Sequence, residues 1–289
     1  MYKYRRVKDG VAFMSRDGFD VKQTLECGQA FRYKNTGAAY RIIARGRAMN
    51  IEQGADEIIF SPCTADDFEN IWVDYFDLET DYTAIKRTLS RGDAVMERAA
   101  GYGGGIRLLN QERWETLVSF IVSQRKSIPA IQTAVSAIAA EYGGQIGPGE
   151  YAFPGPEIFA GVTTEDLSET KTGYRAAYIA DAAQKVNAGA LDLNEMGYLS
   201  TDALLDKLMT IKGVGPKVAN CVALFSFGRR ESFPVDVWVE RAMRRLYFNG
   251  EKVSAQHIKN FAAQKFGGLG GYAQQYLFYY MRGAKSIKK

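Results

Sequence analysis

The stretch LMTIKGVGPKVANC, residues 208–221, places a flexible turn between two apolar segments that have helical character. Its glycines, Gly213 and Gly215, allow a tight turn and leave backbone amides uncovered by side chains. Pro216 suits the first position of the second helix, where its missing N–H would have no partner in any case. Amides and the helix dipole at such an N-terminus can hold a phosphate. The pattern predicts either a plain turn between packed helices or a contact with a DNA backbone.

Two residues near this turn have side chains that could do chemistry. Lys217 directly precedes VANCVALFSF, a segment apolar enough to be almost fully buried. A long cation there can bind a phosphate, extend along the surface to water, or act as a nucleophile once it is neutral. Asp236, in FPVDVW, precedes an apolar helical stripe and is predicted to be an N-cap. Considered singly, each residue has a simpler structural explanation than catalysis.

Composition describes an ordinary globular chain with a mild excess of positive charge. Of 289 residues, 46% are hydrophobic and 24% charged, and the net charge is +4, which is compatible with a polyanionic partner but does not require one. The three cysteines are far apart and His257 is the single histidine, so no cysteine or multi-histidine metal site is predicted. Without an apolar signal core or a run of about 18 apolar residues, the chain is expected to be soluble and intracellular.

Two halves of the chain differ in hydrophobic period. Residues 1 to about 62 contain short β-branched runs and turn signals, as strands and hairpins do. From Thr64, which with Asp67 resembles a capping box, apolar residues recur at helical spacing. The glycine-rich run 101–105 is the predicted hinge. Beyond it, helices are predicted at 174–188, 201–211, 216–227, 237–248, 254–265 and 271–282.

The predicted fold class is therefore α+β. An N-terminal antiparallel β-sheet domain with helices would occupy residues 1–105, and an all-α bundle residues 106–289.

Several motifs together resemble a known family. The hairpin stretch followed by FPVDVW is similar to the helix-hairpin-helix plus Gly/Pro-Asp signature of the DNA base-excision glycosylases, and the lysine is typical of their bifunctional members. GQAFRY at 28–33, GYRAAYI at 173–179 and GYAQQYLF at 271–278 fit the 8-oxoguanine DNA glycosylases. The resemblance spans roughly residues 20 to 282. It implies a TBP-like N-terminal domain, and base excision repair with glycosylase and AP lyase activities.

The resemblance makes Lys217 and Asp236 the catalytic pair. The neutral amine of Lys217 would attack the anomeric carbon, form a Schiff base and permit strand cleavage by β-elimination. Its place in the first turn of a helix, among apolar neighbours, disfavours the ammonium form. Asp236 would stabilise the positive charge that develops on the sugar, or steer proton transfers.

Four further residues are implied to bind the flipped 8-oxoguanine. The backbone carbonyl of Gly28 would accept the N7 hydrogen that guanine lacks, and Gln274 would bind the Watson–Crick edge. Phe278 and Cys221 would enclose the ring; Cys221 lies four residues after Lys217, so both face one side of a helix.

The resemblance also implies DNA contacts outside the base pocket. The hairpin residues Gly213, Val214 and Gly215 would hold the backbone, Tyr174 would be the wedge in the base stack, and Arg175 would contact the widowed cytosine. Trp238 stands where human-type enzymes have a histidine for a phosphate contact.

The segment 124–130, QRKSIPA, departs from the family pattern. Arg125, beside Lys126, takes the place of the asparagine that fills the gap in the duplex. Ala130 stands where an arginine would read the opposite cytosine, so a weakened preference for that base is expected.

The expected partner is double-stranded DNA containing 8-oxoguanine, bound by a monomer with no role for a membrane. No cofactor is required, although K⁺ or another cation could bind hairpin carbonyls of Met209, Ile211 and Val214. The expected location is the cytoplasm, with the nucleoid, in a prokaryote, or the nucleus in a eukaryote.

Three alternatives remain open. A glycosylase for alkylated bases would share the build but use the aspartate without the lysine, and an endonuclease III-like enzyme would normally carry four cluster cysteines. A non-catalytic DNA-binding module would use the hairpin for affinity alone.

Overall fold

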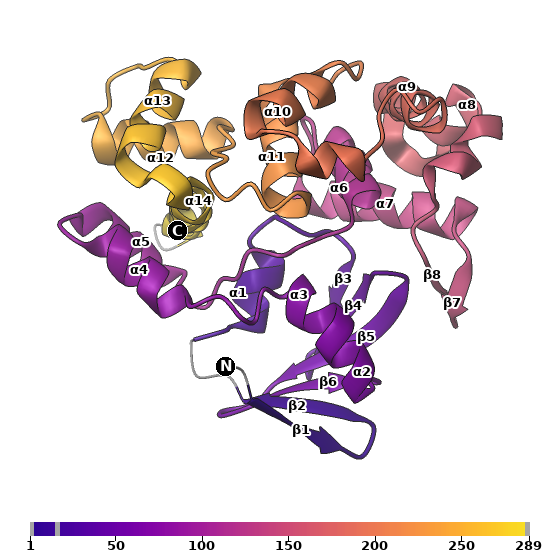
Figure 1. The fold of residues 1–289 in the computed structure, drawn as a ribbon, viewed down its shortest axis with the longest axis horizontal. Helices are drawn as coiled ribbons and strands as arrows, with labels where there is room; N and C mark the ends of the chain where they lie inside the picture. The colour runs from indigo at the N-terminus through magenta and orange to yellow at the C-terminus, as the bar shows by residue number, and fades with distance from the viewer. Residues whose placement is uncertain (1–2, 15–17, 287–289) are drawn as a thin grey trace.

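The computed structural model describes residues 3–14 and 18–286, and its N-terminal part is built on a six-stranded antiparallel sheet (Figure 1). The strand order is β1-β2-β6-β5-β4-β3. The strands are β1 (Lys3–Val7), β2 (Gly10–Met14), β3 (Tyr33–Asn35), β4 (Tyr40–Ala44), β5 (Arg47–Gln53) and β6 (Ile58–Ser61). The predicted strand-rich start of the chain is confirmed.

Local sequence explains how this sheet forms and what covers it. In β4, buried and half-buried residues alternate, so one face carries the apolar side chains. The turn to β5 is Arg45-Gly46, and both residues have positive φ (53° and 68°), as two-residue hairpin turns of type I′ require. α1 (Val21–Glu26) begins at Asp20, whose carboxylate accepts the Gln23 N–H at 2.7 Å.

The helix predicted from Thr64 is present but irregular. The Thr64 hydroxyl accepts the Asp67 N–H at 3.0 Å, which confirms that Thr64 caps the helix. The segment then runs as α2 (Ala65–Asp67), a π-helical stretch η1 (Phe68–Trp72) and α3 (Val73–Tyr75). Phe68 and Trp72 pack into the core of the sheet domain.

Helices make up most of the rest of the chain. They are α4 (Tyr82–Ser90), α5 (Ala94–Tyr102), α6 (Arg113–Val122), α7 (Ile128–Tyr142), α8 (Thr164–Leu167), α9 (Ala176–Asn187), α10 (Thr201–Met209), α11 (Pro216–Ser226), α12 (Val237–Tyr247), α13 (Ala255–Phe266) and α14 (Gly270–Ser286). Five short π or 3-10 segments complete the helical structure: η2 (Pro156–Gly161), η3 (Ser168–Thr172), η4 (Gly173–Arg175), η5 (Glu195–Tyr198) and η6 (Gly267–Leu269). The six helices predicted beyond residue 170 are confirmed, and most of their ends agree within two residues. A small hairpin, β7 (Gln145–Gly147) and β8 (Glu150–Tyr151), was not predicted.

Two hydrophobic cores share the chain without a single boundary, because Cys27 and Phe31 belong to the helical core and Leu109 to the core of the sheet domain. α4 and α5 contribute Tyr82, Leu89 and Met96 to the helical core, and Figure 1 shows both helices beneath α12 and α14. The glycine run 101–105 is a packed crossing, because the Gly105 carbonyl accepts the Asp20 N–H at 2.9 Å. A Cβ on Gly105 would lie 2.2 Å from the Asp20 Cβ, so this glycine permits close approach and not hinge motion.

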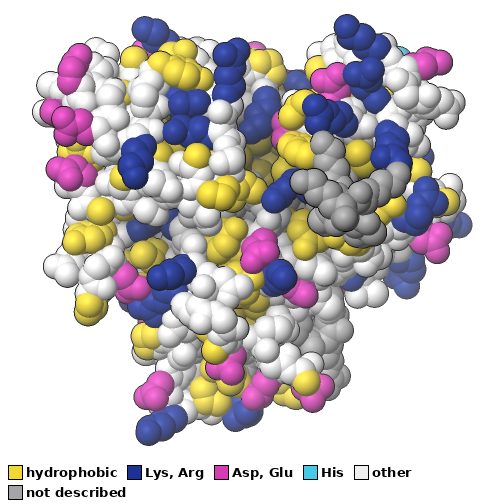
Figure 2. Space-filling model, turned by 180° about the vertical axis from the view of Figure 1, so that it is seen from behind, with side chains coloured by type: hydrophobic (Ala, Val, Ile, Leu, Met, Phe, Trp, Pro, Cys, Tyr) yellow, Lys and Arg dark blue, Asp and Glu magenta, His cyan; other side chains and the backbone are white. Residues whose placement is uncertain are grey.

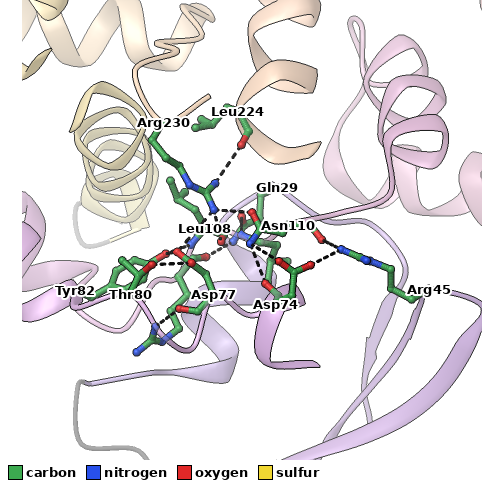
Figure 3. Close-up of polar contacts among 12 residues, drawn as sticks. Gln29, Arg45, Asp74, Asp77, Thr80, Tyr82, Leu108, Asn110, Leu224 and Arg230 are labelled. Carbon is green, nitrogen blue, oxygen red and sulfur yellow. Dashed lines mark hydrogen bonds and ion pairs between the residues drawn. The ribbon is translucent and has the colours of Figure 1, made fainter. Parts of the chain in front are cut away.

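A polar network joins the sheet domain to the helices (Figure 3). Arg230, in the loop after α11, donates to the Leu224 carbonyl at 3.1 Å and to Asn110 Oδ1 at 2.6 Å, and lies 3.7 Å from the Asp77 carboxylate. The amide of Asn110 in turn donates to the Asp74 carbonyl at 2.8 Å. Arg230 therefore connects α11, the linker before α6 and the segment after α3.

Replacing Arg230 by methionine tests this joint. Arg230→Met leaves Asp77 and Asn110 without their cation in a largely buried place, so we expect the free energy of unfolding to fall by about 2–4 kcal/mol. Urea unfolding followed by circular dichroism measures the change.

Arg244→Met is the matched control, because Arg244 forms an exposed pair with Glu240 on α12, worth about 0.5 kcal/mol or less. Equal, small losses in both variants would show that Arg230 does not join the two parts.

Candidate active site

Lys217 lies in the first turn of α11, where the polypeptide emerges from the hairpin. The helix begins at Pro216 after Gly215, and no side chain caps its N-terminus. The half-buried Lys217 places its Nζ 3.5 Å from Ser123 Oγ and 5.2 Å from the centre of the Phe120 ring. The amine therefore lies between a weak hydroxyl contact, the Cys221 thiol and an aromatic ring, at the N-terminal end of α11.

Asp236 is the N-cap of α12, as the sequence predicts. Its Oδ1 accepts the N–H groups of Trp238 at 2.9 Å and Val239 at 2.8 Å. Both capping bonds use the same oxygen, so Oδ2 has no hydrogen bond within the described residues 3–14 and 18–286. A carboxylate held by one oxygen presents the other to a ligand, and the helix dipole stabilises its charge.

Lys217 and Asp236 line the same two adjoining cavities. The larger, about 420 Å³, also includes Gly28, Phe120, Ser123, Lys126, Trp238, Phe278 and Arg282. The smaller, about 40 Å³, includes Gly28, Phe120, Cys221, Gln274, Gln275 and Phe278. Two catalytic candidates from the starts of different helices thus meet at one site, next to all four residues predicted to bind the base.

Gln274 has an unmet hydrogen bond at this site. Its side chain is buried, and its Oε1 has no hydrogen-bond partner among the described residues. A buried acceptor without a donor costs roughly 1–3 kcal/mol. The Watson–Crick edge of a guanine-type base carries N–H donors that would satisfy it, which agrees with the role predicted for Gln274.

Cys221 and Phe278 form apolar walls of the small cavity. Burial raises the pKa of the Cys221 thiol to about 11, although the Lys217 charge acts in the opposite direction. The thiol is therefore protonated near neutral pH and behaves as a packing group, not as a competing nucleophile. Phe278 is half-buried, with the Arg282 guanidinium 5.3 Å from its ring centre.

Gly28 contributes main-chain atoms to both cavities. Its φ of +87° favours glycine, and a Cβ there would lie 3.2 Å from Phe278 and 3.4 Å from Ile128. The position therefore requires glycine for both its backbone conformation and its space.

The hairpin has the form expected of a backbone-binding turn. Gly213 is exposed and Gly215 half-exposed, whereas Val214 is buried. Gly213 has a φ of +75°, and a Cβ would lie 2.3 Å from the Tyr178 ring, so the turn packs tightly on α9. Amides in the uncapped first turn of α11 remain available for a phosphate.

Other predicted DNA contacts lie on two neighbouring loops. Arg125 is exposed with a φ of 54°, and Tyr174 is 54% exposed. Lys126 donates to the Lys171 carbonyl at 2.7 Å, and desolvation together with the Arg175 charge lowers its pKa. These side chains stand where a duplex could meet them.

Arg175 has a different setting from the one the resemblance implies. It is only 6% exposed, and its guanidinium donates to the carbonyls of Gln124 and Thr172. In this state the side chain braces the loop that carries Arg125. Direct contact with an opposite base remains a prediction and would require these bonds to open.

Sequence reasoning missed three residues at the cavity of Lys217. Phe120, in α6, and Ser123, which follows the last residue of that helix, lie three positions apart and both approach Lys217. Arg282 covers Phe278 from α14. Helical spacing could have paired the first two, but nothing local indicates that they face α11.

Positive charge accompanies the site. Lys126, Lys217 and Arg282 line the larger cavity, and Figure 2 shows Lys and Arg side chains over the helical half of the face seen from behind. Such a distribution suits a phosphate backbone. Within the described ranges no cluster of His, Cys, Asp and Glu could hold a metal ion, and no helix could cross a membrane.

Known proteins resemble both halves of the chain. The model for the N-terminal domain of 8-oxoguanine DNA glycosylase matches residues 11–117. The model for HhH-GPD superfamily base excision DNA repair proteins matches residues 118–266. A probable N-glycosylase/DNA lyase of Methanothermobacter thermautotrophicus is 29% identical over 230 residues, which are 72% of this chain and 71% of that protein.

Two solved structures are similar over nearly the whole chain. MBOgg1 in complex with a low affinity DNA ligand is 42% identical with a TM-score of 0.95, covering 99% of both chains. The Clostridium acetobutylicum 8-oxoguanine glycosylase/lyase, bound to double-stranded DNA with cytosine opposite 8-oxoG, is 35% identical with a TM-score of 0.93, covering 99% of this chain and 98% of the other. With its lysine and aspartate at one cavity, the chain belongs to the 8-oxoguanine DNA glycosylase family of the HhH-GPD superfamily.

Proposed function

We propose that this protein removes 8-oxoguanine from double-stranded DNA and then cleaves the strand at the resulting abasic site. The observation that carries the proposal is the meeting of Lys217 and Asp236 at a cavity that also contains the unpartnered oxygen of Gln274. A base inside a duplex is out of reach, so the target nucleotide must be flipped into this cavity. The protein would act wherever the cellular DNA lies.

Lys217 supplies the nucleophile in this mechanism. The lone pair on Nζ attacks the anomeric carbon, and the electrons of the glycosidic C–N bond leave with the base, which takes up a proton. The amine then passes one proton to the ring oxygen as the C1′–O4′ bond breaks, which opens the sugar to a protonated Schiff base. Loss of a C2′ proton then expels the 3′ phosphate, which is the lyase step. The uncapped α11 N-terminus favours a bound phosphate beside the reacting sugar.

Asp236 supplies negative charge opposite the developing cation on the sugar. Its capping bonds to Oδ1 fix the carboxylate on a rigid helix end, so the charge is oriented before the reaction begins. The carboxylate need not become covalently attached for this role.

A cation at the hairpin is a further part of the proposal. The carbonyls of Met209 and Ile211 lie where α10 ends, at the negative end of its dipole, and Ile211 already accepts the Val214 N–H at 3.0 Å. Helix-end carbonyls that lack helical donors suit K⁺. With the Val214 carbonyl, they would hold the cation and stiffen the turn.

Lys217→Gln tests the nucleophile. We expect it to abolish base excision and borohydride trapping while damaged-duplex affinity changes by no more than about threefold, because the hairpin amides remain. Lys212→Gln, at an exposed hairpin lysine, is the control and should still be trapped. Full trapping of the Lys217→Gln protein would refute the assignment, and absence of trapping by the wild type would favour a non-catalytic binding module.

Asp236→Asn separates charge from capping. An asparagine still caps the helix, so we expect the thermal midpoint to change by only a few degrees. Single-turnover excision should fall at least about a hundredfold, since the negative charge is lost. Near-normal excision would mean that Asp236 serves only as a cap.

The unusual residues at 125 and 130 predict a relaxed choice of the opposite base. Ala130 cannot donate to cytosine, and Arg125 can reach carbonyl acceptors on thymine and guanine as well as on cytosine. We expect single-turnover rates opposite C, T and G to agree within about tenfold, because one lost base contact is worth about 1–3 kcal/mol.

Ala130→Arg provides the matched comparison on duplexes with C, T or G opposite the damaged base. It should raise the preference for cytosine by about tenfold. Near-exclusive excision opposite cytosine by the wild type would show that other residues read this base.

A further inference from the structure

The backbone around Gly28 is held by side chains from distant parts of the chain. Gln275, on α14, donates its Nε2 to the Cys27 carbonyl at 2.8 Å. On the other side, the Gln29 carbonyl accepts the side-chain amide of Gln111 at 2.8 Å. The peptide unit that precedes Gly28 and the one that follows Gln29 are thus tied to segments far away in the sequence.

The Gln29 side chain adds a second set of ties. Its Nε2 donates to the carbonyls of Arg107 at 2.7 Å and Thr24 at 2.9 Å, and its Oε1 accepts the Leu109 N–H at 2.9 Å. Gln29 is fully buried, and Figure 3 shows it beside the linker residues Leu108 and Asn110. A buried amide with its donors and acceptor satisfied fixes the groups that it binds.

These ties matter because of what Gly28 presents to the cavity. A glycine has no side chain, so the wall it forms consists of main-chain atoms, including obligatory hydrogen-bonding groups. Glycine is also the most permissive residue in φ and ψ, and by itself it would not hold those groups in one direction. External hydrogen bonds are needed to keep such a wall within about 0.5 Å of a useful geometry.

Gln275 and its neighbour Gln274 on α14 differ in their hydrogen bonds. Gln274 has an unpartnered oxygen at the small cavity, whereas Gln275 is 2% exposed and bound to Cys27. One residue is available to a base, and the next holds the opposite wall. α14 therefore sets the distance between the two sides of the cavity.

We propose that Gln275 is a positioning residue for base selection, acting with Gln29 through the main chain at Gly28. This proposal rests on the proposed function, and it concerns only the choice and seating of the base. The chemistry of Lys217 on a sugar that has already lost its base does not require this wall.

Gln275→Met is the test, because methionine has a similar length but cannot donate to the Cys27 carbonyl. We expect single-turnover excision of 8-oxoguanine opposite cytosine to fall about 10- to 100-fold, as small misplacements of a binding group do. Strand cleavage of a duplex with a preformed abasic site, and its borohydride trapping, should stay within about twofold. A purely structural defect would lower both activities together.

Tyr276→Phe is the matched control on the next residue of α14. The Tyr276 hydroxyl is buried and has no partner among the described residues, so both activities should remain at the wild-type level. If Gln275→Met fails to fold, as a thermal melt would show, Gln275→Asn keeps a polar amide that is too short to reach Cys27 and replaces it in the same assays.

Unchanged excision, or equal losses of excision and lyase activity in the folded variant, would overturn the role of Gln275. Failure of the wild-type protein to excise 8-oxoguanine would instead contradict the proposed function. The two failures are therefore distinguishable in one set of measurements.

Discussion

The active site depends on bringing two helix N-termini to one cavity. α11 starts at Pro216 and α12 at Val237, so the chain must leave the first helix and return within the segment 227–236. Arg229 and Arg230 fix the position of this connecting segment. Arg229 donates to the carbonyls of Gly197 and Leu199 at 2.7 Å, and Arg230 binds Asn110 in the linker before α6. Both positive dipole ends then lie at the cavity, where they favour the Asp236 carboxylate and bound phosphates.

The innermost part of the base pocket is small before DNA binds. Its volume of about 40 Å³ is close to that of a single water molecule and too small for a purine. For a base to enter, the walls must separate, and the half-buried Phe278 lies directly beside Gly28. The hydrogen bonds to the Cys27 and Gln29 carbonyls hold the segment around Gly28, so Phe278 is the wall without such backbone ties.

Sequence alone predicted the elements whose signals are local. The helices after residue 170 follow from their apolar spacing, and Asp236 follows from its place before a helical stripe. The β-branched runs before residue 62 and the capping by Thr64 are equally local. The roles of Lys217, Gly28 and Gln274 came from family resemblance, and the shared cavity is consistent with them.

The features that the sequence did not predict depend on contacts between residues far apart in the chain. Nothing near Tyr82 indicates that α4 packs with the helical core, and glycines at 101–105 look the same in a hinge and in a close crossing. Gln275 has no local signal either, because its partner, Cys27, is distant in the chain and is bound through its carbonyl. Every residue has a backbone carbonyl, so residue type does not indicate which carbonyl accepts such a hydrogen bond.

The two loops predicted to face the opposite base show that a charged residue can support a loop instead of contacting DNA. Arg125, Lys171 and Gly173 all have φ between 54° and 63°, a conformation that costs energy for the two that are not glycine. Arg175 and Lys126 donate to carbonyls on these loops and so offset that cost. Since their donors are engaged with the protein, the residues left to meet the gap in the duplex are the exposed ones at the loop tips. The predicted reading of the opposite base then depends on how rigidly Arg175 and Lys126 hold the loops, as well as on which side chain reaches the base.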